Sequence, residues 1–134
     1  MLIEQAIINK LSVDIAALAP PEKHLYYVGR VPQNVQMPYV VIQTIDDIPA
    51  QSHQGYANLS TARIQINSFD DSYLDCKALD AAIFAALNGF TGIMGGAGGV
   101  YVGKCLKDLS ADFPNDDNPN ISGIHTDYEI QYNT

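Results

Sequence analysis

The spacing of apolar residues changes between Thr61 and Leu87, which predicts a strand followed by a helix. From Ala62 to Asn67 every second residue is apolar, so one face of the predicted strand is apolar and the other polar. Further on, apolar residues recur every three or four positions, as on one side of a helix. This stripe consists of Leu74, Ala78, Leu79, Ala82, Ile83, Ala86 and Leu87. A strand that leads into a helix packed on its apolar face is a basic unit of α+β domains.

The ends of this helix carry the residues that commonly begin and end helices. Ser72 precedes Asp75 by three positions, a capping pattern that provides partners for backbone N–H groups of the first turn. Asp70 and Asp71 place negative charge where the helix dipole favours it. Gly89 then predicts the helix end.

Similar patterns predict one more helix and four more strands. Apolar residues at helical spacing run from Ile3 to Leu18, and Pro20–Pro21 should end that helix. The further strands are expected at Leu25–Val28, Tyr39–Asp47, Val100–Lys107 and Ile124–Tyr132.

The order α-β-β-β-α-β-β predicts an α+β fold with a mostly antiparallel sheet of four to five strands. Both helices should pack on one face of this sheet, because each strand with clear alternation has a single apolar face. The opposite face would carry Arg63, Gln65, Asn67, Asp127 and Glu129.

Three segments read as connections. Pro49–Ser60 is polar and longer than an ordinary hairpin loop, so either the flanking strands continue into it or it is a mobile projecting loop. Both alternatives give an exposed finger between two paired strands. Gly89–Gly99 is rich in glycine and predicts a flexible loop, and Ser110–Asn120 predicts an acidic, turn-rich loop.

Length and composition indicate one domain over residues 1–134, with 47% apolar residues available for a core. No apolar run approaches the length of a membrane span, and the N-terminus lacks the basic region of a signal peptide, so we expect a protein made and assembled in the cytoplasm. The net charge of −8 disfavours binding to nucleic acid phosphates.

No catalytic, cofactor or metal site is predicted. The glycines of Gly92–Gly99 match no phosphate-binding motif, and Asp112, Asp116, Asp117 and Asn118 do not follow the order of a calcium loop. The paired aspartates of Asp46–Asp47 would point to opposite faces of a strand, and His24, His53 and His125 are isolated in the sequence. Cys76 and Cys105 are expected as reduced thiols, not a disulfide. The sequence therefore predicts neither an enzyme nor a small-molecule binder.

Short structural motifs nevertheless resemble one family. Arg30–Val31 is followed within ten residues by Pro38–Tyr39, and Arg63–Ile66 has the pattern R-h-Q-h, where h is apolar. That strand then leads into a helix through Ser72–Tyr73, and DYEIQY lies in a late strand. Together these motifs, which span nearly the whole chain, resemble the tail completion (tail terminator) proteins of long-tailed bacteriophages.

The resemblance implies a structural role in the virion, at the neck where head and tail join. Such proteins cap the head-proximal end of the tail tube as a ring, typically a hexamer, and join it to the head-completion (stopper) protein. The implied partners are copies of the chain itself, the tail tube protein and the stopper protein. DNA would pass through the lumen without specific binding, past an acidic wall. The implied place of assembly is the cytoplasm of the bacterial host, and the implied source of the gene is a phage or a prophage.

The assembly contacts are expected in the finger and in the glycine-rich segment. The candidate interface residues are Gln51, His53, Gln54, Tyr56, Phe90, Ile93 and Met94. An alternative from another class is an acidic, immunity-type inhibitor that masks a basic enzyme, which would need its carboxylates gathered on one patch.

Overall fold

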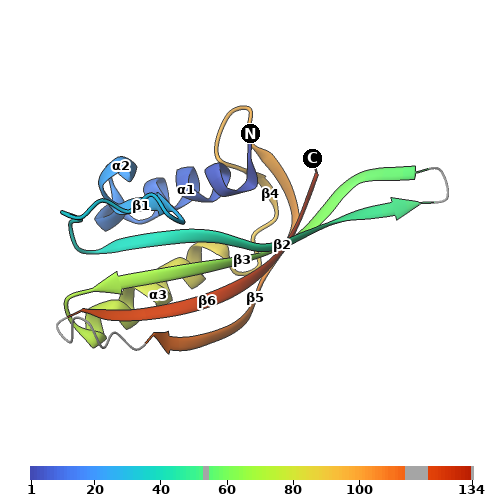
Figure 1. Cartoon of the computed structure of the whole chain (residues 1–134). Helices are drawn as coiled ribbons and strands as arrows, with labels where there is room; N and C mark the ends of the chain where they lie inside the picture. The colour runs from blue at the N-terminus through green and yellow to red at the C-terminus, as the bar shows by residue number, and fades with distance from the viewer. Residues whose placement is uncertain (53–54, 114–120, 134) are drawn as a thin grey trace.

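The computed structural model describes residues 1–52, 55–113 and 121–133 as an α+β fold (Figure 1). Three α-helices, a short 3₁₀ helix and six strands follow the order α1, η1, α2, β1, β2, β3, α3, β4, β5, β6. The helices are α1 (Ile3–Asp14), η1 (Ala16–Leu18), α2 (Pro21–His24) and α3 (Tyr73–Leu87). The strands are β1 (Leu25–Tyr27), β2 (Tyr39–Ser52), β3 (Gly55–Asp70), β4 (Gly92–Met94), β5 (Val100–Phe113) and β6 (Ser122–Asn133).

The six strands form one sheet in the order β1-β2-β3-β6-β5-β4. Every pairing is antiparallel except that of β1 with β2, which is parallel. The expected α+β class is confirmed, whereas the expected count of four to five strands is too low. The sheet is mixed, because β1 and β2 are parallel, and the chain has a third α-helix, α2, beyond the two expected. The additional strand is β4, which forms inside the glycine-rich segment expected to be a flexible loop.

The N-terminal helix is shorter than its apolar spacing predicts. It ends at Asp14, because Ile15 adopts an extended conformation, and the chain then makes the separate turn η1 before the two prolines. Pro21 starts the short helix α2 instead of only ending a helix. A proline suits the first turn of a helix, where its missing N–H would have no partner anyway.

Helices α1 and α3 cover the same face of the sheet, as the alternating strands predict. Ile7 and Leu11 from α1 and Ile83 and Leu87 from α3 belong to one buried cluster with inward-facing strand residues. Those strand residues include Ile42, Ala62, Ile64, Ile66, Tyr128 and Ile130. Arg63, Gln65, Asn67, Asp127 and Glu129 occupy the alternate positions and lie on the uncovered face.

The buried side of α3 differs from the predicted stripe. Leu74 is 78% exposed and Ala78 is also exposed, whereas Cys76 and Asp80 are buried with Leu79, Ile83 and Leu87. The polar side chain of Asp80 can face the sheet because the Thr126 hydroxyl donates a hydrogen bond to it over 2.7 Å. A hydrophobic stripe alone therefore misplaces the rotation of this helix.

Strands β2 and β3 continue well beyond the predicted strands and form a hairpin that projects from the body (Figure 1). Their pairing reaches Ser52 and Gly55, and residues 53 and 54 lie outside the described residues. Of the two alternatives for Pro49–Ser60, the structure has the continued strands. We call Pro49–Ser60 the finger.

Candidate assembly surfaces

The outer part of the finger is a two-stranded ribbon. Strand β6 follows β3 as far as the pair Leu59 and Asn133, and among the described residues no third strand lies beside the outermost pairs, Gln51 with Tyr56 and Ser52 with Gly55. Two candidate residues, Gln51 and Tyr56, are paired directly across this ribbon. His53 and Gln54, which were also predicted as interface residues, lie outside the described residues.

The base of the finger is fixed to the body by the last strand. The hydroxyl of Tyr132 donates a short hydrogen bond to the carboxylate of Asp47 on β2. Around this bond lies a hollow of about 390 Å³, lined by residues of the N-terminus, β2, the glycine-rich turn and β6. The finger, the glycine-rich segment and both chain termini thus meet at one end of the molecule (Figure 1).

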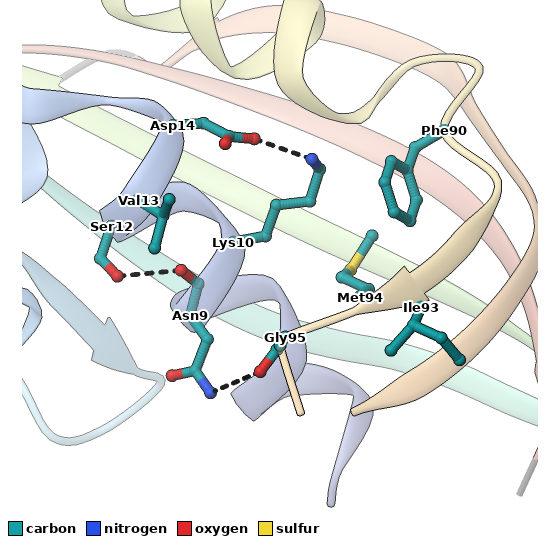
Figure 2. A pocket seen from close by; sticks show the side chains of 10 residues that line it. Asn9, Lys10, Ser12, Val13, Asp14, Phe90, Ile93, Met94 and Gly95 are labelled. Atoms are coloured by element: carbon teal, nitrogen blue, oxygen red, sulfur yellow. Dashed lines mark hydrogen bonds and ion pairs between the residues drawn. The ribbon is translucent and has the colours of Figure 1, made fainter. Parts of the chain in front are cut away.

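A second hollow of about 430 Å³ lies between α1 and β4, and we call it the α1–β4 groove. Figure 2 shows Phe90, Met94 and Ile93 along one side and residues of α1 along the other. The lining residues are Asn9, Lys10, Ser12, Val13, Asp14, Phe90, Ile93, Met94, Gly95 and Gly96.

Polar contacts hold the walls of this groove together. Lys10 forms an ion pair of 2.7 Å with Asp14, one helical turn away, and its ammonium lies 4.2 Å from the centre of the Phe90 ring. Asn9 donates a hydrogen bond of 3.4 Å to the carbonyl of Gly95 (Figure 2). The groove is therefore a packed feature of the fold and not a gap left by a loose loop.

Gly95, directly after β4, occupies a position beside α1 that requires glycine. Its φ of +94° suits glycine, and a Cβ there would lie only 2.9 Å from the Cα of Ala6. The close approach of these two backbones brings β4 against α1.

The three candidate residues of the glycine-rich segment line this groove but differ in exposure. Ile93 is 58% exposed at the rim, and Phe90 is partly buried. Met94 is completely buried, so it contributes to the core and the groove floor and offers no exposed surface. Val13, which was not among the predicted interface residues, is 82% exposed on the opposite wall. It lies off the apolar stripe of Ile3, Ile7 and Leu11, and this spacing is the signal in the sequence that indicates its exposure.

The uncovered sheet face is polar and extensively paired. Arg63 contacts the carboxylates of Asp108 and Asp127, and the hydrogen bond and charge of Asp108 raise the pKa of Arg63. Gln65 lies 3.4 Å from His125 across the neighbouring strands. Asn67 and Asp127 on this face are buried, and each has one side-chain oxygen without a hydrogen-bond partner.

Neither cysteine is an activated nucleophile. Burial is the main cause that raises the pKa of Cys76 to about 11 and that of Cys105 to about 12. A thiol with a raised pKa stays protonated near neutral pH and reacts slowly. Within residues 1–52, 55–113 and 121–133, no three or more His, Cys, Asp or Glu side chains are grouped so that they could hold a metal ion. Asp112, one of the four residues considered for a calcium loop, contacts Tyr73 and Lys77. The other three, Asp116, Asp117 and Asn118, lie outside the described residues.

No helix in the described part of the chain is both long and apolar enough to cross a membrane.

Comparisons with known proteins agree with this architecture. The family model "Tail completion protein gp17" matches residues 5–98. A chain from "Virion of native gene transfer agent (GTA) particle" has a similar fold, with a TM-score of 0.75 and 16% sequence identity. The match covers 98% of this chain and 95% of the other. No curated protein matches the sequence. Because the family model covers well over half of the residues, the chain belongs to the tail completion protein gp17 family and is a structural component of the phage virion.

Proposed function

We propose that this chain caps the head-proximal end of a phage tail tube as a ring of six copies and joins the tube to the head-completion protein. It acts as a structural protein and not as an enzyme. DNA passes through the lumen of the ring without specific binding, and the net charge of −8 supports this, because an acidic wall does not hold phosphates.

The observation that carries the proposal is the finger. A two-stranded ribbon alone is at best marginally stable in water, because it has no further strand or helix to cover it. A segment of this kind gains its packing when another subunit covers it. The finger therefore supports a role in assembly, with Gln51 and Tyr56 on its two strands, and we keep His53 and Gln54 as candidate contacts from the sequence.

The α1–β4 groove supports a second contact near the same end of the molecule. Its rim exposes Ile93 and Val13 beside the partly buried ring of Phe90. Exposed apolar side chains around a hollow are typical of surfaces that receive a partner side chain. We assign this groove to the tube or the head-completion protein, and Met94 supports it from beneath.

The test is complementation of a phage that lacks this gene. One variant replaces residues 50–59 with Asn-Gly, a two-residue turn that suits the paired positions Pro49 and Ser60. Another variant is Ile93→Asp, with Leu74→Asp as its control, because Leu74 is even more exposed but lies on α3, away from both surfaces. Deletion of the whole glycine-rich segment is unsuitable, because Met94 belongs to the core.

We expect the two interface variants to fold, with unchanged circular dichroism, and to leave unjoined heads and tails in electron micrographs. Leu74→Asp should give infectious particles like the unmodified chain. If both the shortened finger and Ile93→Asp joined heads to tails at the normal yield, the assignment of these surfaces would be wrong. If the unmodified chain did not restore joined particles at all, the proposed function itself would fail.

A further inference from the structure

Strand β2 has an edge that is only partly covered, because β1 lies beside its first residues alone. Strand β1 pairs with Val40–Ile42 of the 14-residue β2, and just after this pairing the N–H of Val28 bonds the carbonyl of Ile42 over 3.2 Å. Among the described residues, no strand lies on this side of β2 beyond Ile42. We call residues 43–48 of β2 the open edge.

An apolar hollow of about 400 Å³ lies beside the start of the open edge. It stands where β1 has ended, on the side of the sheet that α1 covers, so a further strand in this position would point side chains into it. Leu2 is 67% exposed and Val28 is 55% exposed at its walls. The lining residues are Leu2, Glu4, Tyr27, Val28, Ile42 and Thr44.

The other face of the open edge also exposes apolar surface. Ile48 is 64% exposed, and Ile45 is exposed as well. The register pairs Ile48 with Thr61 and Asp46 with Arg63, which places both β2 residues on the uncovered face of the sheet. An extended segment beside the open edge would therefore find apolar surface on both of its own faces.

A carboxylate lies on each side of the open edge. At the hollow, Glu4 accepts a hydrogen bond of 2.5 Å from the hydroxyl of Thr44, and on the other face Asp46 is exposed. No ion pair among the described residues involves Glu4 or Asp46. Arg63, which lies opposite Asp46, is engaged by aspartates of β5 and β6. The edge therefore favours a partner that carries basic side chains.

The open edge also limits what can pair with it. Pro49 has no N–H and the register shifts around Ile45, so backbone pairing must be short and side chains must select the partner. A second copy of the chain is a poor occupant, because antiparallel pairing of two open edges would bring Asp46 and Asp47 of both copies together. Like charges that face one another across two strands are destabilising.

We propose that the open edge binds an extended segment of a different protein of the neck, with apolar and basic residues on each of its faces. One apolar side chain enters the hollow between Leu2 and Val28, another lies over Ile48, and Lys or Arg side chains pair with Glu4 and Asp46. The segment adds a strand to the sheet in the place that β1 leaves empty. The inference rests on the proposed function, because it states the chemistry of one partner of this structural protein.

The test uses the isolated full chain and two synthetic peptides as probes. One peptide repeats Val-Lys-Lys-Val, so that each face of the extended peptide carries both kinds of side chain, and the other has Glu in place of every Lys. Fluorescence anisotropy of labelled peptide measures affinity, and exchange mass spectrometry follows the amides of residues 43–48. The variant Asp46→Lys is compared with Asp71→Lys, a matched control at an exposed aspartate just before α3. Circular dichroism checks that both variants fold.

We expect the lysine peptide to bind and to slow exchange in residues 43–48, and the glutamate peptide to do neither. Asp46→Lys should weaken binding of the lysine peptide by roughly fivefold or more, because an attractive cross-strand pair becomes a repulsive one. Asp71→Lys should leave the affinity nearly unchanged.

Three results would overturn the proposed contact. Similar affinities for the two peptides, or binding of neither, would show that the edge does not select a basic strand. Equal losses in Asp46→Lys and Asp71→Lys would indicate attraction by the net charge alone. A dimer of the isolated chain with residues 43–48 protected would assign the edge to a second copy.

Complementation separates this inference from the proposed function. We expect Asp46→Lys to leave heads and tails unjoined, whereas Asp71→Lys joins them. If Asp46→Lys joined them at the normal yield, the open edge would not be a partner site, and the proposed function would stand. If the unmodified chain itself did not restore joined particles, the proposed function would fail, and with it the assignment of the partner to the neck.

Discussion

The hydroxyl of Tyr132 on the final strand donates a hydrogen bond to the carboxylate of Asp47 at the point where β2 leaves the body of the protein. Tyr132 is buried, and its ring belongs to the core. The bond thus connects the core to the base of the finger. It adds a side-chain connection to the backbone pairing between β3 and β6 at the same place.

Tyr132→Phe removes this hydrogen bond and keeps the ring. We expect a loss of about 1–2 kcal/mol in the free energy of unfolding, since the acceptor is a carboxylate. Hydrogen exchange of the amides in β2 at the base of the finger should become faster. Chemical denaturation and exchange mass spectrometry measure both effects. Tyr101→Phe, at an exposed tyrosine of β5, should change neither quantity, and equal effects in the two variants would refute the role of the bond.

Ser72 provides the N-terminal cap of α3, because its hydroxyl accepts a hydrogen bond of 3.1 Å from the backbone N–H of Asp75. Ser72→Ala should lower the free energy of unfolding by about 1 kcal/mol, as is usual for a lost cap. Urea denaturation measures the change. Thr91→Ala, at an exposed position beyond the helix, serves as the control. A stability equal to that of the unmodified chain would show that the cap contributes nothing.

Substitutions at a buried and at an exposed apolar position of α3 should differ in their effect on stability. Ile83 is completely buried, so Ile83→Ala should cost about 2–5 kcal/mol through lost burial and a cavity. Leu74→Ala, on the same helix but 78% exposed, should change stability by less than about 0.5 kcal/mol. Thermal and urea unfolding of the two variants give the comparison. Similar losses at both positions would mean that the helix is rotated differently.

Because both thiols are buried, we expect the free energy of unfolding to fall at high pH. Folding raises the pKa of Cys105 from the ordinary 9.0 to about 12, because burial disfavours the thiolate. The resulting stabilisation is complete below pH 9 and is lost as the pH rises from 9 toward 12, because the unfolded chain ionises first. The urea midpoint should fall over this range, and less steeply in Cys105→Ala.

A direct check of the same burial uses thiol reactivity. At pH 8 the folded chain should react very slowly with Ellman's reagent, and both thiols should react at once in denaturant. Fast reaction of either thiol in the folded chain would contradict its burial.

The sequence predicts best where a local signal and the tertiary structure agree. The alternation of β6 from Ile124 to Tyr132 and the cap at Ser72 are both found as expected. Both depend on neighbouring residues alone. For Pro49–Ser60 the sequence left two alternatives, continued strands or a projecting loop. It could not decide between them, because a polar segment lacks the alternation of apolar and polar residues that predicts a strand.

Other features depend on contacts that no local pattern contains. Strand β4 forms in a glycine-rich segment because Gly95 permits close packing on α1, which places Met94 in the core. In α3, the buried Asp80 accepts a hydrogen bond from Thr126, a residue 46 positions away. The α1–β4 groove likewise combines residues 9–14 of the chain with residues 90–96. Only Phe90, Ile93 and Met94 among its lining residues were predicted as interface residues from the sequence.

The position of β6 also has a consequence for synthesis. It is synthesised after the other described strands, yet it lies in the middle of the sheet between β3 and β5. Until it is present, β1–β3 and β4–β5 remain two separate sets of strands. A chain that is broken off before Ser122 therefore has no continuous sheet, and we expect such an unfinished copy to be excluded from a growing particle by the topology of the fold itself.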